Sequence, residues 1–283
     1  MKFGINIFPT DQTIDPAALA RAAEERGFES LWFPEHSHIP ISRKTPWGGR
    51  EGAPPLPEMY WRTYDQFVAL TAAAAATSRL KVASGITLVA QRDPIWLAKQ
   101  VASVDALSYG RLIFGIGYGW NKEEMAHHGV KYTERRALLR EKVLMMKELW
   151  TRDEASYSGE MLRLDPSWAW PKPHQQPHPP IVLGGAAGPK TFAHIMEFCD
   201  GWMPIYGRHP VVENLIDMRR AAEKAGRDPE TIEIGLFGAP RDLGELEKLA
   251  AAGVSRAVFS LPAVDEHIVI EKLDKYAKFI GKV

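Results

Sequence analysis

The chain has 283 residues, of which 45% are hydrophobic and 25% charged, a composition that indicates a globular protein with a large core rather than a disordered or fibrous one. Its 35 basic and 35 acidic residues give a formal net charge of zero, which argues against a broad binding surface for nucleic acid or an anionic membrane. The opening MKFGINIF lacks the long apolar stretch of a signal peptide, and no later segment offers 18 uninterrupted apolar residues, so we expect a cytoplasmic protein. The single cysteine, Cys199, excludes an internal disulfide and is predicted to be buried.

Short apolar strands alternate with amphipathic helices along the chain. The first strand is predicted over residues 2–8, and the first helix begins with Asp15 as N-cap and Pro16 at N1. The same start recurs at Asp93 and Pro94. The remaining strands are predicted over 30–34, 80–89, 111–117, 181–183, 201–205, 231–237 and 256–261, and the later helices over 189–198, 211–224, 243–252 and 265–279.

This alternation gives eight strands and eight helices. Strict alternation predicts a parallel sheet with right-handed crossovers, and eight such units close into a barrel more readily than they stack in an open sheet. We therefore expect an α/β fold, a single (βα)8 TIM barrel over residues 1–283. An open doubly wound sheet is the alternative.

Two connections are unusually long, residues 37–62 after the second strand and residues 152–179 before the fifth. The second contains Trp168 and Trp170 and is predicted to be a surface strap that packs on the barrel. The first is predicted to be a lid with an apolar, partly basic inner face. Its aromatic and basic residues include Arg43, Lys44, Trp47, Arg50, Tyr60 and Trp61.

Glycines concentrate where the predicted strands end, at the barrel edge where active sites lie. Glycine weakens a strand, so this concentration suggests that something flat or anionic approaches the backbone closely. The run 184–188 precedes Pro189 at the start of a helix, where free N–H groups and the helix dipole suit a phosphate. A plain strand-to-helix turn explains the same run equally well.

Other chemistries find less support in the sequence. The glycines of 115–119 have the wrong spacing for a dinucleotide fingerprint. His36 and His38 form an H-x-H pair beside Glu35, but strands four to six end without histidine or paired carboxylates, so we expect no metal. His127 and His128 are predicted to lie on a helix surface or in a loop, with no partner at the spacing of metal ligands. No serine or cysteine nucleophile motif is present.

Four segments carry a family resemblance: FGINIF, GFESLWFPEH, the block TSRLKVASGITLVAQRDPIWLAKQVASVDALSYGRLIFGIGYGW, and PPIVLGGAAG through FCDGWMP. In order and spacing they resemble the luciferase-like monooxygenase superfamily over nearly the whole chain. The PEH end of strand two and the ITLVAQRDP continuation of strand three resemble the branch that uses coenzyme F420, an 8-hydroxy-5-deazaflavin, rather than FMN.

The resemblance implies a set of cofactor contacts at the strand ends. The ring would stack against Gly85, Ile86 and Thr87, where the family implies a cis peptide bond between the first two. The ribityl tail would follow strand four, and the phosphate would lie in the glycine-rich run. The residues implied for tail and phosphate are Gly117, Tyr118, Asn121, Gly184, Gly185, Ala186 and Ala187.

Three residues are implied for the chemistry. His36 would lie near the redox-active edge of the ring as proton donor, base or hydrogen-bond partner, and Glu35 would contact polar ring substituents. Tyr118 stands where sugar-phosphate dehydrogenases of the family hold a glutamate, which argues against glucose-6-phosphate as substrate. Tyr118 itself could donate a proton or simply stack.

The resemblance leaves three functions, in order of preference. The first is an oxidoreductase that transfers hydride between coenzyme F420 and a small organic substrate. The second is an FMN-dependent luciferase-like monooxygenase, and the third is a non-catalytic flavin-binding barrel. The family also implies a homodimer, with no nucleic-acid or membrane partner.

Overall fold

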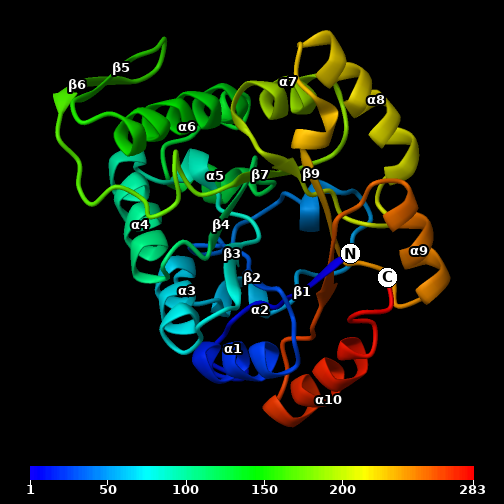
Figure 1. Ribbon diagram of the computed structural model, residues 1–283. Coiled ribbons are helices and arrows are strands. Elements are labelled where there is room, and N and C mark those ends of the chain that lie inside the picture. The colour runs from blue at the N-terminus through cyan, green and yellow to red at the C-terminus, as the bar shows by residue number, and fades with distance from the viewer.

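The computed structural model describes all 283 residues. Eight parallel strands close into a barrel in the order β1-β10-β9-β8-β7-β4-β3-β2, and helices surround it (Figure 1). This confirms the predicted α/β barrel and excludes the open sheet. The barrel strands are β1 Lys2–Asn6, β2 Ser30–Phe33, β3 Lys81–Ser84, β4 Leu112–Gly117, β7 Ile181–Gly184, β8 Gly201–Trp202, β9 Glu233–Phe237 and β10 Arg256–Ser260.

Ten α-helices accompany the strands, two more than the repeating pattern predicts, because one short helix, Met59–Arg62, lies in the first long connection and another, Lys122–His127, follows β4. None of them combines the length and apolar character needed to cross a bilayer. The helices are α1 Pro16–Glu25, α2 Met59–Arg62, α3 Gln66–Ala75, α4 Pro94–Leu107, α5 Lys122–His127, α6 Arg135–Thr151, α7 Pro189–Phe198, α8 Val211–Lys224, α9 Leu243–Ala251 and α10 Glu266–Ala277.

The Asp-Pro helix starts are confirmed. Asp15 Oδ1 accepts hydrogen bonds from the backbone N–H groups of Ala17 and Ala18, both at 2.9 Å. Asp93 Oδ1 accepts from the N–H of Trp96 at 2.8 Å. In both helices the proline at N1 has no N–H of its own to satisfy, so the cap serves the next free donors.

Some strands are shorter than predicted. The third strand ends at Ser84 and not at residue 89, because the chain leaves the ladder at Gly85 and touches its neighbour again only through an isolated bridge from Thr87 to Ile116. The Gly85–Ile86 peptide bond is cis, as predicted. Strand β8 has two residues and not five. These early ends leave irregular backbone at the carboxyl edge of the barrel.

The barrel interior and its outer wall form separate apolar clusters. Six buried residues, one contributed by or beside each of six strands, fill the interior: Trp32, Ala83, Ile113, Val182, Met203 and Val258. A much larger cluster of 59 buried residues lies between strands and helices, and it includes Cys199, which is 1% exposed as expected. The barrel is therefore a filled core and not a pore.

An ion-pair network closes the amino-terminal end of the barrel. Arg256 is 1% exposed and donates from Nε and Nη2 to the two Glu29 oxygens at 2.9 and 2.8 Å. Its Nη1 lies 2.9 Å from Glu233 Oε1, and Lys2 and Lys81 also pair with these carboxylates. Burial alone would raise the pKa of Glu29, but the Arg256 hydrogen bonds and charge outweigh it and lower that pKa to about 2.

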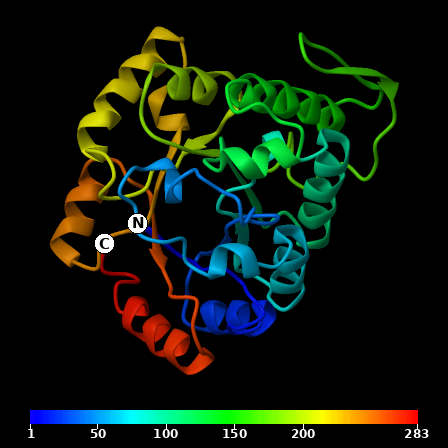
Figure 2. The same cartoon turned by 180° about the vertical axis from the view of Figure 1, so that it is seen from behind.

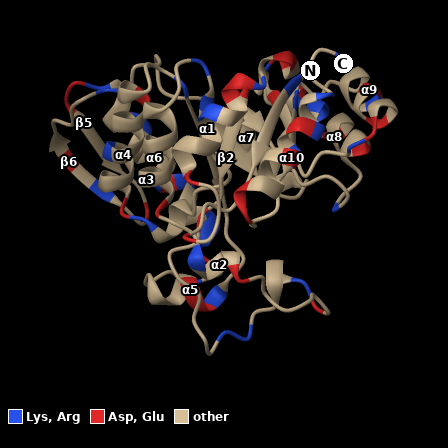
Figure 3. Ribbon diagram, turned by 90° about the horizontal axis from the view of Figure 1, so that it is seen from below, with Lys and Arg blue, Asp and Glu red and all other residues tan.

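The lid connection, residues 37–62, lies at the carboxyl end of the barrel. It contains a 3-10 turn, Trp47–Gly49, and helix α2. Figure 2 shows this segment, in lighter blue, crossing in front of the barrel, and Figure 3 shows α2 and α5 on the same side of the sheet. Figure 3 also shows acidic and basic residues interspersed over the outer helices, with no face of one sign.

The second long connection is more ordered than a strap. It contains an antiparallel hairpin, β5 Ala155–Ser158 and β6 Arg163–Ser167, whose turn is held by the Glu141 carboxylate of α6 through the N–H groups of residues 160–162. Trp168 and Trp170 are 79% and 58% exposed. The hairpin packs on the barrel as expected, with Ala155 buried and Tyr157 and Leu164 against the core, whereas both tryptophans face away from it.

Candidate active site

His36 and Glu124 form a buried pair at the barrel mouth. His36 follows the end of β2 and is 8% exposed, and the Glu124 side chain on α5 is fully buried. His36 Nδ1 lies 2.7 Å from Glu124 Oε2. Burial would raise the pKa of Glu124, but the hydrogen bond and charge of His36, together with the Ser37 N–H, lower it. The carboxylate is therefore ionised and accepts, so Nδ1 carries the proton and Nε2 is left for other partners.

Aromatic residues of the lid cover His36. The ring of Tyr60 lies 5.1 Å from the imidazole between centroids, and Trp120, which follows β4, lies 5.6 Å away. Trp47 packs edge-on against Tyr60 at 5.9 Å. These contacts confirm an apolar inner face of the lid. Trp61 is 49% exposed and lies outside it, so its assignment to that face is wrong.

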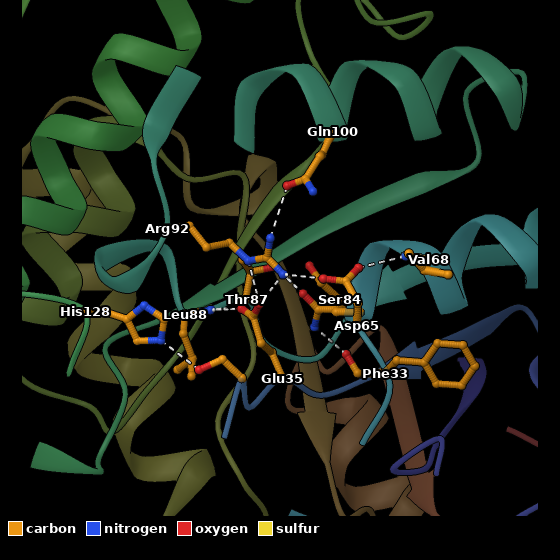
Figure 4. A network of polar contacts seen from close by, with 12 residues as sticks. Phe33, Glu35, Asp65, Val68, Ser84, Thr87, Leu88, Arg92, Gln100 and His128 are labelled. Carbon is orange, nitrogen blue, oxygen red and sulfur yellow. Dashed lines mark hydrogen bonds and ion pairs between the residues drawn. The ribbon is translucent and has the colours of Figure 1, made fainter. Parts of the chain in front are cut away.

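Both carboxylate oxygens of Glu35 are bonded within the protein (Figure 4). Its Oε2 accepts from the Leu88 N–H at 2.6 Å, and its Oε1 pairs with the Arg92 guanidinium. Arg92 also reaches Asp65 at 3.3 Å and Gln100 at 3.1 Å. These bonds fix the backbone that leaves β3 relative to the end of β2 and account for Glu35 without a ligand.

A second buried network holds the same segment. Gln66, the first residue of α3, donates from Nε2 to the Phe33 carbonyl at 2.6 Å and accepts from Thr87 Oγ1 at 2.7 Å. Thr87 is fully buried. Its hydroxyl is therefore directed to α3, and the implied cofactor contact at Thr87 would have to come from its backbone or methyl group.

Gly117 and Gly184 make room for the Ile86 side chain. A Cβ on Gly117 would lie 2.5 Å from Ile86 Cδ1, and a Cβ on Gly184 would lie 2.7 Å from Ile86 Cγ2. No larger residue fits at either position unless Ile86 moves. The two glycines thus admit an isoleucine that wedges between the ends of β4 and β7 and shapes the floor of the mouth.

Tyr118 is directed away from His36, toward the outer helices. Its hydroxyl lies 3.0 Å from His194 Nδ1 on α7, and the Arg136 guanidinium of α6 lies over its ring at 3.8 Å. It is 8% exposed, and burial raises the pKa of its hydroxyl. In this structure Tyr118 supports the α6–α7 wall beneath the glycine-rich loop.

Several polar atoms at the mouth have no partner within the protein. Asn121 is 1% exposed and caps α5 through Oδ1, while its Nδ2 is buried and unpartnered. Four of the seven such buried side-chain atoms in the molecule belong to the lid, to α5 or to the segment after β3: Trp47 Nε1, Gln91 Oε1, Asn121 Nδ2 and Glu123 Oε2. Buried polar atoms are normally hydrogen-bonded, so this concentration fits a site that binds a polar ligand.

The loop from Gly184 to Ala187 ends where α7 begins. Gly188 is the N-cap and has no side-chain oxygen, and Pro189 occupies N1. Ala186 is exposed, and Gly185 accepts a 3.0 Å hydrogen bond from Trp202 Nε1 at its carbonyl. Because no side chain caps the ten-residue helix, its first-turn N–H groups and dipole remain available to an anion.

His127 and His128 are exposed, as expected, and form hydrogen-bond contacts with neighbouring side chains. Ser37 Oγ lies 2.7 Å from His128 Nε2 and 2.9 Å from His38 Nδ1, and His38 Nε2 lies 2.8 Å from His127 Nδ1. His36 and His38 thus face different neighbours, and no group of three or more His, Cys, Asp or Glu residues could hold a metal ion.

Arg43, Lys44 and Arg50 of the lid form no ion pair, whereas Arg62 at its end pairs with Asp11 and Glu58. Arg43 bonds to the Thr45 carbonyl, and its guanidinium lies 5.6 Å from the Trp120 ring centre. Burial, together with the charge of Arg50, lowers the pKa of Arg208, which lies against Gly48 in the lid. Arg50 of the lid therefore lies near another cation, Arg208.

Two cavities flank this region. The first, about 300 Å³, is lined by His36 and by residues of the networks around it, including Glu35, Gln66, Gln91 and Arg92. A larger cavity of about 600 Å³ lies between α7 and α8 on the outside of the barrel and shares no lining residue with the first. Ionisable side chains indicate a reactive site better than cavity volume does, and they line the smaller cavity. We therefore take the smaller cavity as the candidate site.

Sequence analysis missed Glu124, Trp120 and Arg92 as parts of this site. Glu124 stands three residues after Asn121, the pattern of a capping box, which predicts a bond back to the cap. Instead its carboxylate serves His36 and Ser37. Trp120 and Arg92 were visible beside motif residues, but nothing in their spacing indicated a role.

Comparison with solved structures supports the same architecture. The monooxygenase RslO1 from Streptomyces bottropensis superposes with a TM-score of 0.80 over 99% of this chain and 98% of that one, at 21% identity. At this identity the likeness establishes the fold alone.

Comparison with known sequences identifies relatives and a family. An uncharacterized protein of Mycobacterium tuberculosis is 39% identical over 280 residues, 96% of this chain and 97% of that protein. The F420-dependent hydroxymycolic acid dehydrogenase of Mycobacterium tuberculosis is 28% identical over 269 residues, 93% of this chain and 68% of that protein. The luciferase-like monooxygenase family matches residues 1–254. The chain belongs to the luciferase-like monooxygenase family.

Proposed function

We propose that this protein is an oxidoreductase that transfers hydride between coenzyme F420 and a small organic substrate. The observation that carries the proposal is the buried His36–Glu124 pair at the barrel mouth, 2.7 Å between Nδ1 and Oε2, beneath an aromatic lid. A histidine whose second nitrogen is free, held by an ionised carboxylate, suits proton transfer to or from a substrate oxygen. The F420-dependent relative supports the choice of cofactor.

The residues at the barrel mouth fit the polar groups, the phosphate and the acidic tail of a deazaflavin. The unpartnered Asn121 Nδ2 and Gln91 Oε1 offer a donor and an acceptor at the mouth, and the uncapped start of α7 suits a phosphate. The lid cations Arg43, Lys44 and Arg50, none of which forms an ion pair, suit the acidic tail that F420 has and FMN lacks.

The chain's own residues would orient, shield and move a proton. A bound deazaflavin supplies the hydride chemistry. His36 Nε2 takes the proton of a substrate hydroxyl, or returns it to a carbonyl oxygen in the reverse direction. Trp47 and Tyr60 exclude water from the mouth. Glu124 holds the imidazole in one tautomer and stabilises its protonated form.

The decisive experiment is titration of the purified protein with F420 and with FMN, followed by oxygen uptake of each reduced complex. We expect tighter binding of F420 and little oxygen uptake. Stronger FMN binding with oxygen uptake would instead favour an FMN-dependent monooxygenase. Binding of F420 without turnover of any alcohol or carbonyl compound would favour a non-catalytic barrel.

We propose that the protein forms a homodimer and has no nucleic-acid or membrane partner. Sedimentation of the same preparation tests this.

A further inference from the structure

Ser37 connects the buried carboxylate of Glu124 with three histidines near the surface. Its hydroxyl lies 3.4 Å from Glu124 Oε1, 2.7 Å from His128 Nε2 and 2.9 Å from His38 Nδ1. Its backbone N–H also donates to Glu124 Oε1 at 3.1 Å, which fixes the hydroxyl beside the carboxylate. His38 Nε2 then lies 2.8 Å from His127 Nδ1.

The path leads from two buried residues to side chains at the surface. His36 and Glu124 are buried beneath the lid, His38 is half-buried, and Ser37, His127 and His128 are exposed. Tyr60 and Trp120 pack on the His36 ring. The lid therefore separates His36 from bulk water, and the contacts through Glu124 lead out of the mouth.

We propose that Glu124 and Ser37, with His128 and His38, form a path that carries a proton between His36 and solvent. The inference rests on the proposed function, because hydride transfer to or from an alcohol or carbonyl carbon requires a proton at the oxygen. Glu124 and Ser37 are positioning and relay residues in this proposal, and His36 is the residue that meets the substrate.

The steps balance without a further reactant. In the direction of alcohol oxidation, the substrate O–H bond breaks and the proton forms a bond to His36 Nε2. The Nδ1–H bond of the same ring breaks, and its proton passes to Glu124 Oε2. Rotation of the protonated carboxyl group about its Cγ–Cδ bond brings this O–H to Ser37, the O–H bond breaks, and the proton passes to Ser37 Oγ while the serine releases its own to His128 or His38. The imidazolium then loses that proton to water, and reduction runs the same steps in reverse.

The charge states of the end groups suit this transfer. Burial, reinforced by the charge of His38, lowers the pKa of His128, which keeps that ring neutral and able to accept. Glu124 is ionised and accepts from His36. Ser37 Oγ carries one proton, so in the resting protein it donates to one of these neighbours and accepts from another.

The path predicts how fast the His36 Nδ1 proton exchanges with water in the ligand-free protein. Histidine-selective ¹⁵N labelling and saturation transfer from water give this rate, and His36→Asn identifies the signal. We expect Ser37→Ala to slow the exchange at least tenfold with the thermal midpoint unchanged, and Ser37→Thr, which keeps a hydroxyl, to restore the wild-type rate. The double variant His38→Ala/His128→Ala should slow exchange as Ser37→Ala does.

The His194 ring, which pairs with Tyr118 away from the path, is the internal control, and its exchange should be equal in every variant. Wild-type exchange in Ser37→Ala, or slow exchange in Ser37→Thr, would overturn the path. Since no cofactor is present, this result is independent of the proposed function. Absence of F420 binding in the titration would reject that function and leave the exchange data unaffected.

Discussion

The packing of Ile86 against two glycines gives a quantitative prediction. A methyl group at position 184 would lie 2.7 Å from Ile86 Cγ2, well inside van der Waals contact, and Cγ2 cannot move without rotation of the branched side chain. Overpacking of this kind costs about 1–3 kcal/mol. The gain from a less flexible unfolded chain, about 0.4–1 kcal/mol for Gly→Ala, offsets only part of it. We expect Gly184→Ala to lower the free energy of unfolding by about 1–2 kcal/mol.

A double-mutant cycle isolates the contact. Ile86→Ala removes Cγ2, so Gly184→Ala in that background should be neutral or slightly stabilising, a coupling energy of about 2 kcal/mol. Ile86→Val keeps Cγ2 and removes only Cδ1, so it should relieve Gly184→Ala very little. The same valine should relieve Gly117→Ala in part, since a Cβ there lies 2.5 Å from Cδ1 and 2.8 Å from Cγ1.

Urea unfolding followed by circular dichroism measures each corner of the cycle. The neighbouring Gly185→Ala is the matched control, because its Cβ would meet Tyr118 Cε2 at 3.5 Å, an ordinary contact. Gly184→Ala that destabilises the Ile86→Ala protein as much as the wild type would refute the reasoning, since the cost would then not come from Ile86.

Three further predictions concern charge and catalysis. Gly185→Asp should abolish cofactor binding in a fluorescence titration while the barrel still folds, because repulsion from a phosphate at about 4 Å is on the order of 4 kcal/mol; unchanged affinity would place the anion elsewhere. His36→Ala should reduce turnover about a hundredfold to ten-thousandfold with little change in cofactor affinity, and wild-type turnover would reduce His36 to a structural role. Glu29, whose pKa falls from 4.5 to about 2 on folding, should stabilise the protein fully above pH 4.5 and lose that contribution as the pH falls toward 2. Glu29→Gln should therefore cost about 3 kcal/mol at neutral pH and flatten acid unfolding in that window; an unchanged acid transition would contradict the role of the Arg256 pair.

The barrel was predictable because local signals and tertiary packing agree along most of the chain. Asp15-Pro16 and Asp93-Pro94 mark helix starts by a mechanism that needs only neighbouring residues, and both caps form as predicted. The β5–β6 hairpin was not predictable in this way. Its strands carry charged residues and a proline, and its turn is held by Glu141, a residue some twenty positions earlier in the chain.

For two of the glycines at the strand ends, the structure shows a close neighbour other than the one that the sequence suggested. Sequence analysis takes their concentration as a sign that a ligand approaches the backbone. At Gly117 and Gly184 the group that approaches is the Ile86 side chain of the protein itself. A glycine shows only that something lies close, and the identity of the neighbour depends on how β3, β4 and β7 are brought together.

Glu124 shows the same limit for a charged residue. Three positions after Asn121 at the start of a helix, a glutamate has a sufficient local explanation as the second member of a capping box. Asn121 does cap, with Oδ1 accepting from the Glu124 N–H, but the carboxylate turns to His36, 88 positions away in the sequence. Neither residue alone predicts the other, because their distance is set by closure of the barrel and by the placement of α5 over the end of β2. A local rule explains why Glu124 stands at this helix start, but it gives no indication of the partner that its carboxylate finds in the folded chain.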